Sequence, residues 1–208
     1  MSKAVMISVQ PEWCAMIANL LKTIEIRKDF PKLETPFKCY IYCTKRPPYL
    51  VLGDVFRGNW ETEYTTTYGY SREEADRIWG TMNGKVIGEF VCDKISTYPY
   101  VEDDSDPGVW RYEIPTSEGE RTGLKYDDFV AYGKGQTLYG WHISDLKIYG
   151  VYDELLEITQ FIKPCPYDEI CECCDMYFEL EDCCKNAALQ LRRPPQSWFY
   201  VEDGVFSA

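Results

Sequence analysis

The sequence predicts an α+β fold in which short helices decorate a small PUA-like β-barrel. Two observations favour this class. The apolar runs are short, rich in β-branched and aromatic residues, and separated by turn residues, which is typical of strands. Aromatic side chains make up 15% of the 208 residues, and this length suffices for one domain with an insertion. The pattern favours a barrel over a doubly wound sheet.

The predicted elements follow from hydrophobic period and from helix-start and turn residues. The expected strands cover residues 4–9, 23–27, 37–44 and 86–95, with a further one that ends near 148. The expected helices begin at Pro11 and cover about 71–79 and 126–132. Residues 99–123 are acidic and rich in turn residues, and we expect a surface loop there.

The chain divides into two parts by composition. We expect residues 1–152 to form the barrel domain, with an insertion at about 53–84. Residues 153–208 are predicted to be a cysteine-rich appendage and a C-terminal strand. Because the two prolines of "RRPPQSWFYVED" forbid a helix, the aromatic run after them is expected to return to the barrel as a strand.

Charge is distributed unevenly along the chain. The formal net charge is −12, which disfavours indiscriminate binding to nucleic acid. Residues 1–50 nevertheless carry a net charge of +4, whereas residues 151–191 carry −8. A local basic cleft is compatible with this pattern. No window approaches the roughly 18 consecutive apolar residues of a membrane span, and the N-terminus lacks a secretory signal pattern.

The segment "KTIEIRK" at 22–28 concentrates charge around two isoleucines. In a strand, Ile24 and Ile26 point to one face, while Glu25 and Arg27 point to the other. The isoleucines would anchor the strand in the core, so that Lys22, Glu25 and Arg27 converge on one cleft. The alternative is a solvated surface ion pair worth less than about 1 kcal/mol.

Five blocks of the sequence together resemble the ASCH-domain proteins, a branch of the PUA-like superfamily, in particular the versions of bacteriophages and their bacterial hosts. The blocks are "SVQPEWCAMIANLLKTIEIRK", "PFKCYIYCTK", "GKVIGEFVCDKI", "YGKGQTLYGWHISDLKIY" and "RPPQSWFYVE". The most specific piece is the K-x-x-E-x-R pattern, and the domain proper covers about residues 4–152. The resemblance implies a compact β-barrel with a helix across it and a cleft that the pattern faces.

The family resemblance also implies a function. Its general role is binding of RNA or of a modified nucleoside, and some small members are amidohydrolases that remove an acetyl group from N4-acetylcytidine. Those members place a threonine nucleophile where this chain has Glu25, and Thr23 lies one position away. Lys22 is retained, and Glu25 would have to activate water as a general base. This departure favours recognition over catalysis.

The candidate ligand-binding residues combine cations, one carboxylate and aromatic rings that can stack on a base. They are Trp13, Lys22, Thr23, Glu25, Arg27, Lys28, Lys45 and Trp141. In a hydrolase, Lys22 and Glu25 would be the catalytic pair. Core packing is the alternative role of both tryptophans, and ordinary solvated charge is that of Lys45. The lone His142 is expected to be a hydrogen-bonded structural residue.

Six cysteines lie within twenty residues of the acidic C-terminal part. They are Cys165, Cys171, Cys173, Cys174, Cys183 and Cys184, and four of them would close a tetrahedral structural zinc site. The alternatives are buried free thiols or, in an oxidising compartment, disulfides. By contrast, four cysteines occur in helix or strand patterns and are expected to be buried and inert: Cys14, Cys39, Cys43 and Cys92.

The sequence thus predicts a cytoplasmic protein, in the host cytoplasm if phage-encoded, that binds RNA or a modified nucleoside or nucleotide. Two alternatives remain. One is hydrolysis of an acyl-modified nucleoside such as N4-acetylcytidine. The other is an acidic module in which residues 99–123 and 151–191 contact a basic host protein, with solvated charge as the simpler explanation of these residues. No membrane partner is expected.

Overall fold

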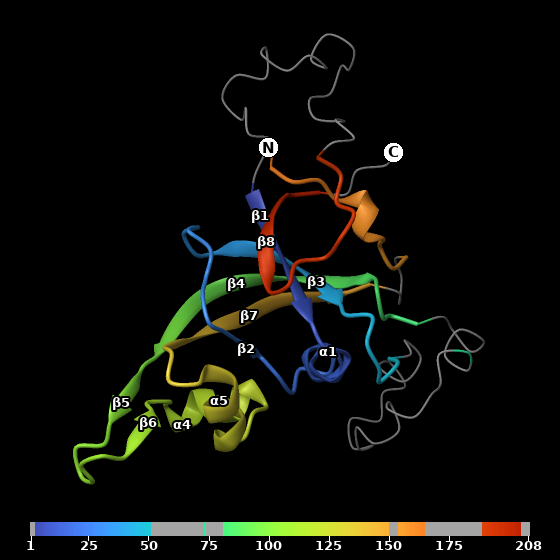
Figure 1. Ribbon diagram of the computed structural model, residues 1–208. Helices are drawn as coiled ribbons and strands as arrows, with labels where there is room; N and C mark the ends of the chain where they lie inside the picture. The colour runs from blue at the N-terminus through green and yellow to red at the C-terminus, as the bar shows by residue number, and fades with distance from the viewer. Residues whose placement is uncertain (1–2, 51–72, 74–80, 150–153, 165–188, 205–208) are drawn as a thin grey trace.

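The computed structural model describes residues 3–50, 73, 81–149, 154–164 and 189–204 (Figure 1). One six-stranded sheet organises these residues, in the hydrogen-bonded order β2-β7-β4-β3-β1-β8. Its strands are β1 (Lys3–Val9), β2 (Ile24–Arg27), β3 (Phe37–Cys43), β4 (Val86–Tyr98), β7 (Leu138–Ile148) and β8 (Trp198–Glu202). The pair β1 and β3 is parallel, and every other neighbouring pair in the sheet is antiparallel.

Short helices and a hairpin complete the described structure. The helices are α1 (Pro11–Ala18), α4 (Thr116–Gly119) and α5 (Tyr126–Gly133), with 3-10 turns η2 (Glu120–Thr122) and η3 (Ile158–Gln160). The hairpin pairs β5 (Tyr100–Glu102) with β6 (Trp110–Tyr112). Figure 1 shows the hairpin, α4 and α5 gathered at one end of the sheet, where α5 lies beside the β5–β6 hairpin. Strand and helix predictions for the described core are thereby confirmed.

The sheet is buried on both faces. Along β1, Val5 and Ile7 pack into one apolar cluster with α1, while Ala4 and Met6 pack into a second cluster on the opposite face. A strand buried on both sides is a continuous apolar run, which explains the composition of residues 4–9. A third cluster, around Tyr98, lies between the long strands and the α5 end of the molecule.

The predicted closed β-barrel is wrong for the described residues. Strands β2 and β8 are the two ends of the hydrogen-bonded order, and no backbone ladder joins them there. The Arg27 side chain of β2 reaches instead to the backbone of Ser197 and Ser8, beside the start of β8 and the end of β1. Side-chain hydrogen bonds therefore take the place of the ladder that would close a barrel.

The prediction that residues 99–123 form a surface loop is also wrong, because the segment has regular secondary structure. The segment contains the β5–β6 hairpin, α4 and η2. Aromatic rings meet across the hairpin: Tyr100 packs on its register partner Tyr112 and on the diagonal neighbour Trp110, with ring centroids 4.9 and 5.8 Å apart. Aromatic cross-strand contacts stabilise short hairpins, and they outweighed the acidic, turn-rich composition.

Several predictions fall on residues outside the described ones. These are the helix at 71–79, most of the insertion at 53–84 and the six clustered cysteines. The division into a domain at 1–152 and an appendage at 153–208 stays a prediction.

The C-terminal strand β8 pairs antiparallel with β1, from Lys3↔Glu202 to Ile7↔Trp198. In the described part of the chain, no helix is long and apolar enough to cross a membrane.

Candidate functional site

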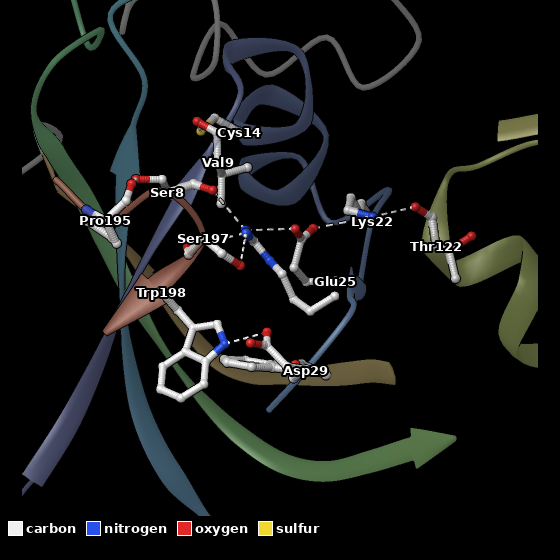
Figure 2. Close-up of polar contacts among 12 residues, drawn as sticks. Ser8, Val9, Cys14, Lys22, Glu25, Asp29, Thr122, Pro195, Ser197 and Trp198 are labelled. Atoms are coloured by element: carbon white, nitrogen blue, oxygen red, sulfur yellow. Dashed lines mark hydrogen bonds and ion pairs between the residues drawn. The ribbon is translucent and has the colours of Figure 1, made fainter. Parts of the chain in front are cut away.

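Three charged side chains meet at the start of β2. Glu25 Oε1 lies 2.9 Å from Arg27 Nη2, and Glu25 Oε2 lies 3.3 Å from Lys22 Nζ. Lys22 is 2% exposed, and Glu25 and Arg27 are each 6% exposed. We refer to these three residues as the Lys22–Glu25–Arg27 cluster (Figure 2). Their burial excludes the alternative of a solvated surface ion pair.

The backbone that leads into β2 sets the position of the cluster. Helix α1 begins with Pro11 and ends in a turn in which Leu20 adopts a left-handed conformation with φ of 59°. The Lys22 backbone N–H then donates to Met16 O at 3.1 Å, which fixes the approach to the strand. In β2, Glu25 pairs with Trp141 of β7, and Ile24 and Ile26 are buried on the apolar side as the alternation predicted.

Arg27 is held by main-chain acceptors as well as by Glu25. Its Nη2 donates to Ser8 O at 2.8 Å, and its Nη1 donates to Ser197 O at 3.3 Å and to Ser197 Oγ at 3.4 Å. Ser8 Oγ in turn donates to Pro195 O at 2.6 Å. A planar group with fixed donors is well suited to such an arrangement.

Lys22 is similarly constrained. Its Nζ donates to Thr122 O at 2.7 Å and lies 5.4 Å from the centroid of the Trp13 ring. Burial lowers the pKa of Lys22 from its usual value, and the nearby Glu25 carboxylate partly opposes this effect. The negative charge of Glu25 therefore helps to keep the buried Lys22 amine in its protonated, hydrogen-bond-donating form.

A cavity of about 270 Å³ opens beside the cluster. It is lined by Ser8, Val9, Gln10, Trp13, Lys22, Glu25, Ile26, Arg27, Thr44, Leu124, Tyr132, Gln196 and Ser197. Within the described part of the chain, Arg27 Nε and Thr44 Oγ1 have no hydrogen-bond partner, and Glu25 Oε2 has only its ion pair with Lys22. Buried polar atoms are normally satisfied, so these three atoms are exceptions. They belong to residues that line the cavity, although the atoms themselves have almost no solvent-accessible surface.

The structure brings four of the predicted site residues to the cavity: Trp13, Lys22, Glu25 and Arg27. Trp141 does not reach it, because its side chain is fully buried in the core and its Nε1 donates to Asp29 O at 3.3 Å. The core-packing alternative therefore holds for Trp141, and its assignment as a base-stacking residue is corrected.

The other three predicted residues lie around the cavity without lining it. Thr23 Oγ1 accepts from Arg121 Nε at 2.9 Å. Lys28 is exposed, with Nζ 5.2 Å from the centroid of the Tyr132 ring. Lys45 is exposed as well. Because Tyr132 lines the cavity, Lys28 stands next to its rim, whereas the Thr23 hydroxyl is engaged elsewhere.

Sequence reasoning missed nine of the thirteen residues that line the cavity. Ser8, Thr44, Tyr132, Gln196 and Ser197 come from four separate parts of the chain. The signal for the last two was present in the "RPPQSW" block, where a polar pair follows two prolines. No local pattern distinguishes the hydroxyls from ordinary strand residues, because their role depends on which strands become neighbours.

A second polar network surrounds Glu118. Its Oε1 accepts from Lys94 Nζ at 2.8 Å and Ser96 Oγ at 3.0 Å, and its Oε2 accepts from Tyr98 OH at 2.8 Å. Burial alone would raise the pKa of Glu118, but these hydrogen bonds outweigh it and lower the pKa to about 2. Ser96 Oγ also lies 2.8 Å from His142 Nε2. His142 is thus a buried, hydrogen-bonded residue, as predicted.

The four cysteines of the described core are free and buried: Cys14, Cys39, Cys43 and Cys92. Burial raises the pKa of three of these thiols, to about 12 for Cys92 and well above the usual value for Cys14 and Cys39. Thiolates are therefore scarce at neutral pH, in agreement with the predicted inertness. Among the described residues, no group of three His, Cys, Asp or Glu side chains is placed to hold a metal ion.

Comparison with known proteins gave matches only among solved structures. No family model matches the chain, and no curated protein matches it. The crystal structure of ASCH from Zymomonas mobilis is 15% identical, with a TM-score of 0.46 over 96% of this chain and 88% of that one. A mutant of the same protein is 14% identical, with a TM-score of 0.49 over 97% and 92%. Both carry the name of the family that the sequence resembles, whereas the phage or bacterial type stays a prediction.

Proposed function

We propose that the cavity binds a nucleobase, either in RNA or in a modified nucleoside. The observation that carries the proposal is the buried Lys22–Glu25–Arg27 cluster, whose three charged residues line a cavity of about 270 Å³. That volume is close to the lower end of the roughly 300–1,000 Å³ of ligand pockets, so the ligand is small.

The chemistry of the wall matches the edge of a base. The Glu25 carboxylate can accept from an exocyclic amine or a ring N–H, and the Arg27 guanidinium can donate to a carbonyl or ring nitrogen. The rings of Trp13 and Tyr132 also line the cavity and offer faces for stacking. The Glu25 carboxylate is the acceptor, and Arg27 and Lys22 are the donors. Because their own hydrogen bonds hold these side chains in place, little conformational freedom is lost when a base binds.

Thr44 provides a test that spares the fold. Thr44 lines the cavity and its Oγ1 has no partner among the described residues, so Thr44→Val should leave the free energy of unfolding nearly unchanged. We expect it to weaken nucleoside binding about 2- to 10-fold, which corresponds to one net hydrogen bond. Calorimetric titration with single-stranded RNA and a panel of modified nucleosides measures this loss.

The controls for this titration are the wild type and a remote variant. Thr137→Val makes the same change on a threonine that does not line the cavity, and it should bind like the wild type. Absence of measurable binding to RNA and to every nucleoside at low salt would contradict the proposal. Equal affinity of wild type and Thr44→Val would remove Thr44 from the site.

The amidohydrolase alternative stays a prediction. The paired Lys22 and Glu25 support it, whereas the Thr23 hydroxyl does not line the cavity. Incubation of N4-acetylcytidine with stoichiometric protein, followed by chromatography, separates the two functions. If the substrate stays unchanged, the hydrolase hypothesis is contradicted and binding is the function that remains. The acidic interaction module and the zinc site also stay predictions, for which pull-down with a charge-neutralised surface and elemental analysis are the respective measurements.

A further inference from the structure

A second hollow, separate from the cavity of the Lys22–Glu25–Arg27 cluster, lies near the C-terminal strand. Its volume is about 610 Å³, and it is lined by Lys163, Gln190, Leu191, Arg192, Arg193, Pro194 and Phe199. Three of these side chains are cationic, and none of the described lining residues is acidic. We refer to Lys163, Arg192 and Arg193 as the basic hollow.

The backbone around the basic hollow is fixed by long-range hydrogen bonds. Lys163 N donates to Leu189 O at 2.8 Å, and Leu191 N donates to Phe161 O at 2.8 Å. Leu191 is buried in the second apolar cluster, against which Phe199 also packs. The two segments are therefore held side by side, and the floor of the hollow is apolar.

The cations of the basic hollow are distinguished by lying together in one hollow without carboxylate partners among the described residues. Several other lysines and arginines of the described chain form ion pairs with carboxylates, as Lys38, Arg46, Lys94 and Arg111 do. Lys163, Arg192 and Arg193 are exposed and have no ion pair or hydrogen bond from their side chains to any described residue. In a chain of net charge −12, three unpaired cations in one hollow favour an anionic ligand.

The basic hollow is also close to the cavity along the chain. Arg193 is three residues before Gln196, which lines the cavity, and three residues of chain span at most about 11 Å. An arginine side chain shortens that gap further. We propose that the basic hollow binds backbone phosphates of a single-stranded nucleic acid whose base occupies the cavity. This inference rests on the proposed function and narrows it to an oligonucleotide.

The physical pattern is that of a single-strand binding surface, in which cations follow the phosphates and apolar or aromatic side chains contact the bases. The guanidinium groups of Arg192 and Arg193 match phosphate geometry in a bidentate way, which a lone lysine cannot do. A free nucleoside has no phosphate and would leave the basic hollow unused. The ligand affinity should therefore increase with oligonucleotide length and decrease with salt.

The test uses the full chain and two charge variants. Arg192→Gln with Arg193→Gln removes two cations from the basic hollow, and Lys32→Gln with Lys134→Gln removes two exposed cations that line neither hollow. Each protein is titrated with a ten-nucleotide single-stranded RNA, with the nucleoside that binds best, and with a polyglutamate peptide, at several salt concentrations.

We expect the arginine variant to bind RNA about 25-fold more weakly than the wild type at 0.1 M salt. The slope of log affinity against log salt should become shallower by about 1.4, because each of two lost phosphate contacts contributes about 0.7 for a single strand. Nucleoside affinity should stay within twofold. The lysine variant should match the wild type in both measurements. Polyglutamate should bind at least tenfold more weakly than RNA.

Three results with the variants and the competitor would overturn the inference, and a fourth concerns the wild type. The first is unchanged RNA affinity and salt slope in the arginine variant, and the second is an equal loss in the lysine variant. The third is polyglutamate binding as tight as RNA binding, which would make the hollow a general anion surface. Nucleoside binding by the wild type with no gain for the oligonucleotide would overturn this inference alone, whereas absence of all binding would overturn the proposed function with it.

Discussion

Replacing Glu25 by glutamine isolates the charge of the buried cluster, because glutamine keeps the size and shape of the side chain. The carboxylate is the counter-charge of two cations, with Arg27 Nη2 at 2.9 Å and Lys22 Nζ at 3.3 Å. Removal of one partner from a buried ion pair costs about 3–5 kcal/mol, since the remaining charge is left desolvated. Here two cations remain.

The magnitude should fall at the lower end of that range. Lys22 keeps its bond to Thr122 O, and Arg27 keeps its bonds to Ser8 O and Ser197 O. We therefore expect a loss of about 3 kcal/mol in the free energy of unfolding. For a chain of this length, the midpoint of thermal unfolding would fall by roughly 6–12 °C. Urea unfolding measures the loss directly, with an unchanged m-value as the sign that both proteins unfold alike.

The pH dependence distinguishes a charge effect from a packing effect. Burial lowers the pKa of folded Lys22, and loss of Glu25 removes the group that raises it, so the pKa in the variant is lower still. An unfolded lysine keeps its proton up to about pH 10.4. Between the folded and unfolded pKa values the unfolded chain binds more protons, and stability rises with pH. The deficit of Glu25→Gln should therefore shrink as pH rises from 7 toward 10.

Glu89→Gln is the matched control. It makes the same change in a strand, but Glu89 is half-buried and its partner Lys38 lies 3.5 Å away with a side chain that is 34% exposed. Exposed pairs contribute less than about 1 kcal/mol. A loss below about 1 kcal/mol in Glu25→Gln, or a deficit that stays constant up to pH 10, would refute the argument that buried charge governs the cluster.

Two further predictions concern the end of the sheet near α4. The pKa of Glu118 of about 2 lies below its unfolded value, so its stabilisation is present above about pH 4.3 and is lost as pH falls toward 2. Glu118→Gln should remove roughly 2 kcal/mol of this pH dependence between pH 6 and 2.5, measured by urea unfolding at each pH. Gly140→Ala should cost about 1–3 kcal/mol, because an added Cβ would lie 2.5 Å from Tyr98 Oη. Gly119→Ala, whose Cβ would meet only Ile114 at 3.6 Å, is its control and should cost nothing.

Local pattern was sufficient for the strands and helices of the described core. The apolar run of β1 and the alternation of β2 predicted their faces, because hydrophobic period records which side is buried. Proline at position 11 predicted the start of α1. Closure of the sheet could not be predicted in this way. It depends on whether β2 and β8, 170 residues apart at Arg27 and Ser197, pair through backbone or through a side chain.

The site residues that lie within the single segment 22–27 could be predicted from the sequence. The K-x-x-E-x-R spacing places Glu25 and Arg27 on one face of β2, and the structure brings Lys22 to the same carboxylate. Thr44 and Ser197 were missed because their part in the cavity arises from strand neighbours. Trp141 was misassigned, since a strand position fixes the face of a side chain but not whether solvent reaches it.

The energetics of the cluster favour recognition as the reason for its burial. A buried ion pair is often no more stabilising than apolar side chains of similar volume. The neighbouring Ile24 and Ile26 show that β2 already supplies apolar residues to the core. Three charged groups therefore contribute something that aliphatic groups would not, namely fixed donors and acceptors on a cavity wall. Arg27 holds the strands together with its terminal nitrogens and also lines the cavity, so the same side chain can close the fold and contact a ligand.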